Sequence, residues 1–523
     1  MNGAPIGIRK TSTLTRQVAT HMAQLQVKGV YHAAVLGDTH TQSVESRHEA
    51  NLILRSVTPT TASALHVMSE WNLALNVAHA VATRGGRALI VGGWVRDRLL
   101  NIPSKDIDLE VYGLPAEQLL TLLQEHGTVS TVGESFTVYK LGPLDVALPR
   151  TESKTSHGHR GFTVAGDPYL SIEIASRRRD FTINAISWDP LRDEYLDPHN
   201  GRFDLDSHRL RMVDPKTFGD DSLRVLRAIQ LAARLEFKMD TDTKQQCNSI
   251  SLDDLPAERI WIEIEKLLLR AERPSLGLAL ARELGVVKQL FPELEALIDC
   301  PQEPEWHPEG DVWTHNLLVI DQARKRIDDL NHPQQVTVML GALCHDFGKP
   351  RTTAFVDGRI RSRNHEKLGV APTTSFLDRL QIYTLDGYNV RMQVLSLVAN
   401  HLKPGMWYTA RDGVGDGAFR RLARKVDLEL LTRLATADCL GRTGTFDCSA
   451  MNWFRKRAED IGVKHGPPTA ILMGRHLLAL GVPPGQRMGT LLRQVYERQL
   501  DSGIASIDEA IDEAKKLLDA PDE

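Results

Sequence analysis

The sequence lacks the features that would assign it to a membrane, secreted or zinc-finger class. No apolar run approaches the roughly 20 residues that a membrane-spanning helix needs. The chain has only 5 cysteines, and none stand in a Cys-x-x-Cys pair, which argues against a zinc knuckle or a disulfide framework. Because this cysteine usage fits a reducing compartment, we expect a cytoplasmic protein with no membrane partner.

Acidic residues are missing from the first 37 positions, which carry the basic residues Arg9, Lys10, Arg16 and Lys28. Organellar transit peptides share this bias. A disordered bacterial extension or a misplaced start codon explains it better. Periodicity stays weak beyond this segment, and we predict poor order for residues 1–68.

Excess positive charge is also missing, since the net charge is −4. Any contact with RNA must therefore come from local basic faces, such as 177–179 or the group Arg420, Arg421, Arg424 and Lys425. Such runs are more often solvated surface. The 523 residues, with 42% apolar and 25% charged side chains, indicate an ordinary globular chain of three or four domains.

The most informative segment that is present is 90–113, where an apolar strand begins with Asp106-Ile107-Asp108. Residues two apart in a strand point to the same face, so the two carboxylates aim at one point. They repel each other unless a cation lies between them, and Mg²⁺ prefers such oxygen ligands. An isolated Asp-x-Asp is common by chance, but this one stands in a specific context.

That context is a glycine pair. The apolar run Ala88 to Val91 leads into Gly92 and Gly93, and a helix-like segment with Arg96 follows. The glycines allow backbone N–H groups to approach a phosphate, and Arg96 adds a charged donor. The pattern predicts a phosphate-binding turn.

The run Gly-Gly-x-Val-Arg-Asp-x-Leu-Leu followed by Asp-x-Asp resembles the head-domain motif of class II tRNA nucleotidyltransferases, the CCA-adding enzymes, and of bacterial poly(A) polymerases. The resemblance implies a polymerase-β-like nucleotidyltransferase fold that uses Mg²⁺ with ATP and CTP and acts on a tRNA 3′ end. It would place Gly92, Gly93 and Arg96 at the nucleotide, and Asp106 and Asp108 at the metals.

Residues 178–185 match a second family motif, Arg-Arg-Asp-Phe/Leu-Thr-x-Asn-Ala. Arg179 can neutralise triphosphate charge, and Asn184 offers a neutral donor and acceptor to a ribose or to backbone. The alternative is a basic loop before a buried helix.

Residues 221–228 resemble the family segment Glu-Asp-x-x-Arg-x-x-Arg, with Asp220 where Glu is usual. Asp221 and Arg224, three apart, would be neighbours on a helix. The carboxylate can accept from the amino group of C or A while the guanidinium donates to the adjacent ring atom. Uracil and guanine present a carbonyl there, so a protein template for C and A follows. An ordinary surface ion pair is the alternative, and Arg227 completes the predicted nucleotide site.

Two head positions leave alternatives open. Gln230 stands where the family usually has another arginine, so addition of only part of CCA, or action on another RNA 3′ end, remains possible. Asp145 could be a third catalytic carboxylate, since this polymerase superfamily often uses one on a neighbouring strand. A solvated strand end explains it equally well.

A second set of metal-ligating side chains follows in the C-terminal half, where His345-Asp346 comes after the apolar segment Val336 to Cys344. The order His…His-Asp…His…His…Asp resembles HD-superfamily phosphohydrolases. Imidazole and carboxylate ligands suit Mn²⁺, Fe²⁺, Ni²⁺ or Mg²⁺, so we expect a divalent transition metal or Mg²⁺ that activates water against phosphorus. The predicted ligands are His315, His345, Asp346, His365, His401 and Asp438.

The HD domain of some bacterial CCA-adding enzymes has phosphatase and 2′,3′-cyclic phosphodiesterase activity, which the resemblance implies here. The segment Gly441 to Gly444 is a further local match. His307 is expected to be structural.

Local patterns predict a helix over Trp71–Ala82, strands at Phe136–Leu141, Asp145–Leu148 and Ser171–Ile174, a mobile loop over Pro149–Pro168, and helices from about residue 215 onward. The expected fold class is an α+β polymerase-β-like nucleotidyltransferase head followed by an all-α neck, an HD domain and a helical tail. The predicted domains are the head (69–190), the neck with its base-selecting helix and RNA-binding surface (191–300), the HD domain (301–465) and the tail (466–523).

The leading hypothesis is a CCA-adding tRNA nucleotidyltransferase with an appended phosphohydrolase domain. A poly(A) polymerase shares the head motifs, but bacterial ones typically carry a basic C-terminal extension, whereas this chain ends Asp-Ala-Pro-Asp-Glu. An HD phosphohydrolase whose head only binds RNA is a third hypothesis. The sequence gives no indication of oligomeric state.

Overall fold

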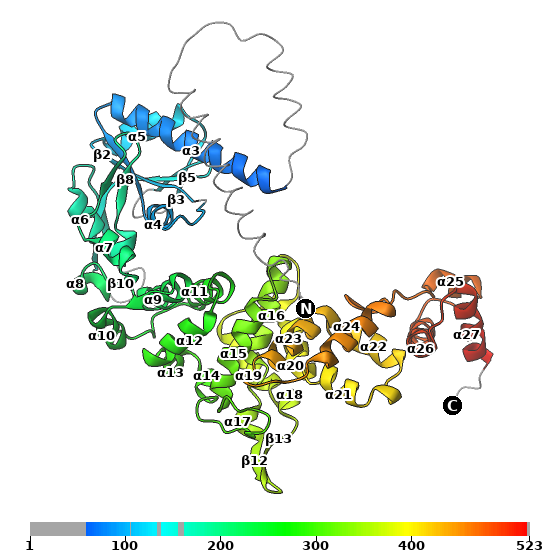
Figure 1. Cartoon of the computed structure of the whole chain (residues 1–523). Helices are drawn as coiled ribbons and strands as arrows, with labels where there is room; N and C mark the ends of the chain where they lie inside the picture. The colour runs from blue at the N-terminus through cyan, green and yellow to red at the C-terminus, as the bar shows by residue number, and fades with distance from the viewer. Residues whose placement is uncertain (1–58, 105, 133–137, 155–161, 520–523) are drawn as a thin grey trace, which may run out of the picture. The chain divides into compact units, whose positions relative to one another are not determined.

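The computed structural model describes residues 59–104, 106–132, 138–154 and 162–519 (Figure 1). Most of the segment predicted to be poorly ordered lies outside these residues. Helix α3 (Pro59–Thr83) begins well before the expected start at Trp71. None of the helices in the described ranges is long and apolar enough to cross a membrane.

The predicted head is built on a mixed seven-stranded sheet in the order β3-β4-β5-β2-β1-β8-β9. Strand β1 is buried along nearly its whole length, which explains its continuous apolar sequence. It pairs antiparallel with β2, and β2 pairs parallel with β5. The strands are β1 (Arg87–Val91), β2 (Asp108–Tyr112), β3 (Val129–Val132), β4 (Val138–Leu141), β5 (Leu144–Ala147), β8 (Ser187–Asp189) and β9 (Glu194–Leu196).

Short helices connect these strands. Helix α4 (Gly93–Leu99) follows β1 directly, α5 (Ala116–Gln124) follows β2, and the turn η1 (Thr182–Asn184) precedes β8. The amphipathic α5 buries Leu119, Leu122 and Leu123, which are spaced as one helix face requires.

Two local predictions for the head are wrong. Ser171 to Ile174 is not a strand, because the Ser171 hydroxyl accepts a hydrogen bond from the Ile174 N–H and caps helix α6 (Ile172–Ser176). In the segment predicted to be a loop, β6 (Arg150–Lys154) and β7 (Phe162–Gly166) pair as an antiparallel ribbon. Backbone pairing of this kind needs no apolar alternation, so the sequence pattern did not reveal it.

Beyond the sheet the chain is mainly helical, as predicted, with the short strands β10 (Arg209–Leu210) and β11 (Lys238–Met239) between helices. The helices of the predicted neck are α7 (Gly201–Asp206), α8 (Pro215–Phe218), α9 (Leu223–Leu235), α10 (Thr241–Ser249), α11 (Ala257–Arg270), α12 (Pro274–Glu283), α13 (Val286–Leu290) and α14 (Pro292–Glu295).

Helix α16 (His332–Cys344) is the centre of the predicted HD domain. Nearly every residue from Val336 to Cys344 is buried, and the helix packs against α15, α20 and α23. The other helices here are α15 (Val312–Arg324), α17 (Lys349–Thr352), α18 (His365–Leu368), α19 (Val370–Arg379), α20 (Val390–Asn400), α21 (Lys403–Thr409), η2 (Arg411–Gly413), α22 (Asp416–Ala423), α23 (Leu428–Leu440) and α24 (Ser449–Asp460).

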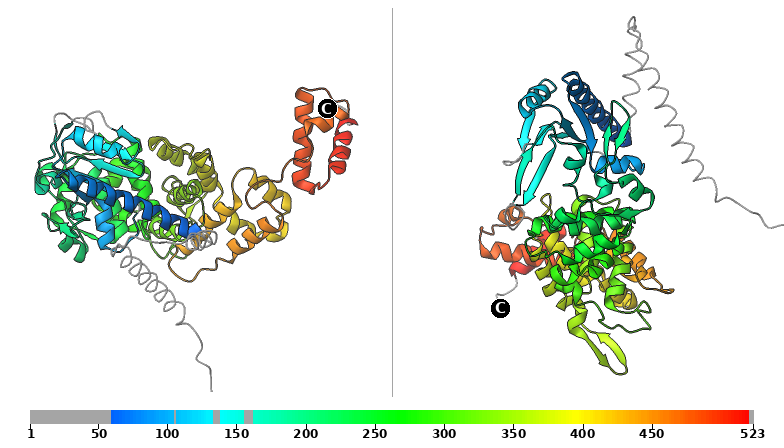
Figure 2. Two further views of the ribbon diagram at one scale, coloured as in Figure 1. Left: turned by 90° about the horizontal axis from the view of Figure 1, so that it is seen from above. Right: turned by 90° about the vertical axis from the view of Figure 1, so that its left-hand side faces the viewer.

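One feature of this region departs from the helical prediction. Strands β12 (Thr353–Val356) and β13 (Arg359–Ser362) form an antiparallel ribbon that projects from the surrounding helices (Figures 1 and 2).

The C-terminal helices α25 (Gly474–Ala479), α26 (Gln486–Ser502) and α27 (Ile507–Asp519) bury their own apolar cluster. Helix α22 meets α26 through the predicted basic face, since Arg421 pairs with Asp501, Arg424 with Glu497, and Arg420 donates to the Leu500 carbonyl. These three arginines therefore hold the tail helix in place.

Candidate active sites

The phosphate-binding turn predicted at Gly92 joins β1 to α4. Gly92 has a φ of 78°, in the left-handed region that favours glycine. A Cβ atom there would lie 3.4 Å from a guanidinium nitrogen of Arg179 and 3.6 Å from a carboxylate oxygen of Asp108. The turn therefore brings two parts of the predicted site directly against its backbone.

The acidic residues lie at the start of β2. The strand begins at Asp108 rather than at Asp106, but Asp106 and Asp108 are exposed while Ile107 between them is buried, so the expected alternation holds. The parallel register sets Asp145 beside Asp108 on the neighbouring strand. Asp145 also makes an ion pair of 2.8 Å with Lys140.

These carboxylates repel one another. Burial raises the pKa of Asp108 to about 6 in spite of Arg179, and Asp145 and Asp106 raise it further. A divalent cation would relieve this repulsion, so the residues fit a metal site of oxygen ligands.

A cavity of about 410 Å³ joins the head motifs to helix α9. Nine of the predicted nucleotide and catalytic residues line it, whereas Asp106 and Asp145 are not part of its wall. Its wall contains seven arginines against three aspartates, an excess of positive charge that suits a triphosphate. The lining residues are Gly92, Gly93, Arg96, Asp108, Arg150, Arg178, Arg179, Asp180, Asn184, Asp221, Leu223, Arg224, Arg227 and Arg259.

A buried hydrogen-bond network fixes one side of this cavity. Arg96 donates to the Asn184 side-chain oxygen at 2.7 Å, and the Asn184 amide donates to Asp180 at 3.0 Å. Asp180 in turn pairs with Arg227 at 2.6 Å. Burial alone would raise the pKa of Asp180, but the charge of Arg227 and the hydrogen bonds from Arg227, Asn184 and the Phe181 N–H together lower it. Both ends of the Asn184 amide are thus engaged by protein groups.

The predicted base-reading pair is arranged differently from the expectation. Asp221 does not lie on the same helix as Arg224, because α9 begins at Leu223. The Asp221 carboxylate instead precedes the helix and accepts a hydrogen bond from the Leu223 N–H. Arg224 donates to the carbonyl oxygens of Thr217 and Arg178. The two side chains still line the same cavity.

Arg259 is a site residue that the sequence did not reveal. It lies on α11 and donates to Asp221 at 2.9 Å. No motif surrounds it, so only the fold shows its place. Gln230, the departure from the family pattern, is buried in α9 and is not part of the cavity wall.

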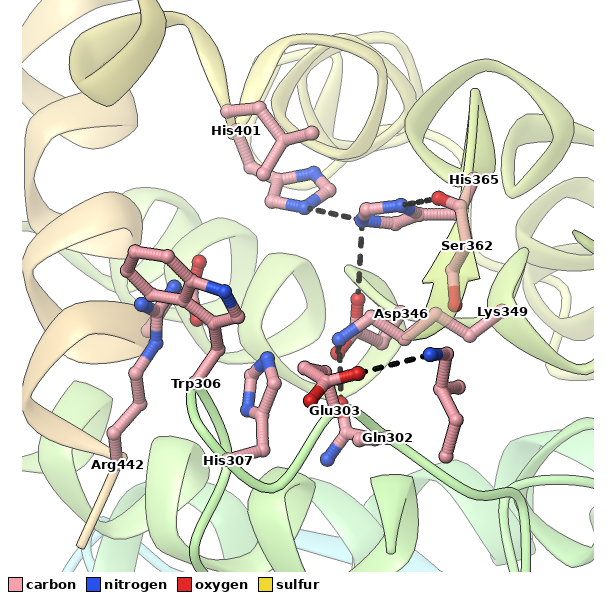
Figure 3. Close-up of a pocket in the computed structure, with 13 residues that line it drawn as sticks. Gln302, Glu303, Trp306, His307, Asp346, Lys349, Ser362, His365, His401 and Arg442 are labelled. Carbon is pink, nitrogen blue, oxygen red and sulfur yellow. Dashed lines mark hydrogen bonds and ion pairs between the residues drawn. The ribbon is translucent and has the colours of Figure 1, made fainter. Parts of the chain in front are cut away.

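The six predicted HD ligands come together in two sets, each with ligand atoms within 4.8 Å of one another. All six residues are buried, with relative exposures of 0 to 8%. They come from α15, the ends of α16 and α20, the start of α18, and α23. Figure 3 labels three of them, Asp346, His365 and His401. The sets are His315 with His345 and Asp438, and Asp346 with His365 and His401.

Each histidine is oriented by a bond at Nδ1. His315 contacts Glu309 at 2.8 Å, while His345, His365 and His401 contact backbone carbonyls at 2.7 to 2.8 Å. Because Nδ1–H donates in each case, the Nε2 lone pairs face the centre of the cluster. Burial, followed by His365 and His345, lowers the pKa of His401 to about 3, which keeps its ring neutral.

Asp346 lies between the two sets. One oxygen is 3.4 Å from His365 Nε2, and the other is 3.1 Å from His345 Nε2 and 2.7 Å from the Lys349 ammonium. His345 Nε2 is buried and makes no hydrogen bond of proper geometry. The histidine Nε2 lone pairs converge, and the two oxygens of the Asp346 carboxylate face different ligand sets. This arrangement fits divalent cations.

Sequence reasoning missed several neighbours of this cluster. Glu309 contacts both His307 and His315, and its pKa falls to about 2 because these bonds outweigh burial. His307, expected to be structural, lines the cavity beside the cluster together with Lys349 and Arg442. That cavity measures about 270 Å³, and Figure 3 shows most of its lining residues.

The expectation of no disulfide is wrong for one pair. Cys439 and Cys448 are bonded across the connection between α23 and α24, with Cα atoms 6.0 Å apart. Their spacing matches no short motif, so the bond could not be predicted from it. Cys247, Cys300 and Cys344 are free and buried.

Family models match three successive parts of the chain. Residues 88–211 match the poly A polymerase head domain, 236–298 match a probable RNA and SrmB-binding site of polymerase A, and 312–442 match the HD domain.

Curated relatives and solved structures extend these matches. The chain is 38% identical over 305 residues to a multifunctional CCA protein of Mannheimia succiniciproducens, covering 56% of this chain and 70% of the relative. It is 36% identical over 378 residues to one of Thioalkalivibrio sulfidiphilus, covering 69% and 86%.

In fold, the chain resembles a CCA-adding enzyme solved with CTP (TM-score 0.55, 19% identity, 90% of this chain and 98% of that one). It also resembles the Thermotoga maritima CCA-adding enzyme solved with tRNA (TM-score 0.53, 19% identity, 90% and 98%). The predicted fold class is confirmed, and by its identity with curated relatives over most of their length the chain belongs to the multifunctional CCA protein family.

Proposed function

We propose that this chain adds C and A nucleotides from CTP and ATP to the 3′ end of tRNA without a nucleic-acid template. The observation that carries the proposal is the single cavity shared by the Gly92 turn, Asp108, Arg179 and the Asp221–Arg224 pair. Curated relatives named multifunctional CCA proteins support it.

Arg179, beside the Gly92 turn, binds the triphosphate. Asp106 and Asp108, with Asp145 beside them, would hold Mg²⁺. Two Mg²⁺ ions there would neutralise charge on the α-phosphate and favour ionisation of the RNA 3′-hydroxyl. Asp221 and Arg224 select the base edge, and Arg259 positions the Asp221 carboxylate. Arg96, Asn184 and Arg227 hold the head motifs against α9 through Asp180.

The proposed division of labour follows the predicted domains: a head at 69–190, a neck at 191–300, an HD domain at 301–465 and a tail at 466–523. We place the protein in the cytoplasm, where tRNA matures.

We propose that the HD domain is a separate metal-dependent phosphohydrolase, acting on phosphate monoesters or 2′,3′-cyclic phosphates. A transition metal or Mg²⁺ bound by the two ligand sets would supply Lewis-acid activation of water and of the ester. Glu309 and the carbonyl partners hold the histidines in the ligating tautomer.

The test is incubation of the purified protein with tRNA that ends before CCA, after C or after CC, and with each nucleoside triphosphate alone and in pairs. Product length and sequence are then read. We expect CMP on the first two substrates, AMP only after CC, and no further growth.

Other results would overturn the proposal in distinct ways. A long run of AMP would indicate a poly(A) polymerase, and a stop after CC or activity only on CC ends would indicate a partial enzyme. No incorporation at all would leave an HD phosphohydrolase with an RNA-binding head.

A further inference from the structure

The cavity at the HD ligands continues into a second one. The first, of about 270 Å³, and the second, of about 430 Å³, share Glu303, Trp306, Ile360 and Ser362 in their walls. The second is completed by Arg359, Arg361 and Arg363. We call this second cavity the β13 groove, because it follows strand β13 away from the metal ligands.

Strand β13 is held in place at the junction. The Ile360 N–H donates to a Glu303 carboxylate oxygen at 2.9 Å, and the Ser362 hydroxyl bonds the Thr353 hydroxyl on β12 at 2.7 Å. Alternation along the strand then leaves Arg359 and Arg361 exposed, and Arg363 follows just after the strand. The ribbon thus presents a row of guanidinium groups at the mouth of the site.

Two of these arginines differ from the third in their ion pairing with described residues. Arg359 pairs with Glu305 at 3.0 Å, but within the part of the chain that the structure describes no ion pair reaches Arg361 or Arg363. Unpaired exposed guanidinium groups attract phosphates, and a polyanionic strand would release counterions on binding there.

Trp306 stands where the two cavities meet, and half of its surface is exposed. An exposed indole beside a basic groove is a stacking platform for a nucleobase. Deeper in, Lys349 and Arg442 line the metal-ligand cavity and can meet a terminal phosphate (Figure 3). The arginines that can bind RNA phosphates, the indole that can stack a base and the pocket that can hold the terminal phosphate therefore lie along a single path.

We propose that the β13 groove binds the nucleotides upstream of the terminal nucleotide of an RNA strand, with one of their bases on Trp306 and their phosphates on Arg361 and Arg363. The HD site then prefers the 3′-phosphorylated or 2′,3′-cyclic end of an RNA strand to a free mononucleotide. This inference rests on the proposed hydrolase function. When a cyclic phosphate opens, a water oxygen bonds to phosphorus, one ribose P–O bond breaks, and a water proton passes to the released ribose oxygen.

The experiment compares hydrolysis of 2′,3′-cyclic AMP with that of a short oligoadenylate ending in a 2′,3′-cyclic phosphate, using the full chain. Trp306→Ala and the double variant Arg361→Ala/Arg363→Ala should each lower kcat/KM for the oligonucleotide about tenfold, mainly through KM. Neither should change hydrolysis of the mononucleotide more than about twofold. Trp306→Phe should restore most of the oligonucleotide activity, and the arginine variant should weaken its salt dependence.

The matched control is Arg351→Ala/Lys367→Ala, which removes two exposed charges of the same domain that line neither cavity. It should behave as the unmodified protein. Equal effects of the groove variants on both substrates, or no effect on either, would overturn the proposal.

Binding of a labelled oligoadenylate with a 3′-phosphate, followed by fluorescence anisotropy, separates the two hypotheses. If the protein hydrolyses neither substrate, the proposed hydrolase function fails. The groove is still supported if its variants bind this oligonucleotide about tenfold more weakly than the control variant, and is refuted if they bind equally.

Discussion

The head cavity and the HD cavity prepare their metal ligands in opposite ways. In the head, Asp106 and Asp108 are exposed at the start of the inner strand β2, and the cavity wall that includes Asp108 is rich in arginine. In the HD domain, six buried ligands already converge, and each histidine ring is fixed through Nδ1.

This difference follows from what each site must hold. The head has to admit a triphosphate together with its Mg²⁺ ions. Its carboxylates therefore supply only some of the metal ligands, and phosphate oxygens of the substrate supply the others. The HD cluster can hold its metal before any substrate arrives, because no ligand has to come from elsewhere. The two activities should therefore respond independently to mutation.

The largest effect is expected from Asp108→Ala. Loss of the carboxylate beside the Gly92 turn should reduce CMP and AMP incorporation by about a thousandfold or more, because it removes a metal ligand from the transition state. Asp106→Ala should do the same. Single-turnover incorporation measures this, with HD hydrolysis as the internal control. Retention of more than a few per cent of transfer in both variants would contradict the assignment.

Almost as large an effect is expected from His345→Ala/Asp346→Ala on the other site. The double variant removes a ligand from each set, so bound transition metal and phosphohydrolase activity should both be lost, while incorporation changes less than about twofold. Metal content by mass spectrometry and assays with Mg²⁺, Mn²⁺, Co²⁺ and Ni²⁺ provide the readouts. Parallel loss of both activities would show that the sites are not independent.

Nucleotide choice should change more moderately. Asp221→Ala and Arg224→Ala are each expected to reduce discrimination against UTP and GTP by about tenfold, because the hydrogen bonds to the base edge are lost. Relative kcat/KM values for the four nucleotides measure this. Arg259→Ala, which removes only the partner of Asp221, should have a smaller effect of the same kind. An equal loss of affinity for all four nucleotides would mean that this segment holds only phosphate.

The smallest effect concerns packing beneath the HD ligands. A Cβ on Gly348 would lie 2.0 Å from the His365 carbonyl oxygen, so Gly348→Ala must push the His365 segment away from Asp346. We expect a loss of about 1–3 kcal/mol in stability and a lower affinity for metal, with transfer unchanged. Thermal unfolding with and without metal tests this. Gly415→Ala, at a position of extended backbone with open space around it, tests whether any glycine replacement has the same effect.

The sequence predicted the head through short, contiguous motifs, since the Gly92 turn, the Asp108 strand and the Arg179 segment each carry several chemical groups in a row. The metal ligands of the HD domain were predicted only from the order of histidines and aspartates along the chain. Their arrangement in two sets became visible only in the folded structure. What could not be predicted comes from long-range contact. Arg259 meets Asp221 from another helix, and Glu309 meets His315 from a loop without any periodic pattern.

The ribbon β12–β13 was missed for a related reason. Its strands are too short to show the alternating pattern of a strand within a region of helical periodicity, although its arginines were visible in the sequence. Only the fold places them beside Trp306.

The most direct test of two independent metal sites is a crystal structure of the protein grown with Mn²⁺ and CTP, with the manganese located by anomalous scattering. We expect manganese at Asp106 and Asp108, with the triphosphate on Arg179 and the cytosine edge at Asp221 and Arg224. We also expect separate manganese at the HD cluster, with Asp346 between the two ligand sets. CTP bound elsewhere, or no manganese at either group of carboxylates, would contradict the account.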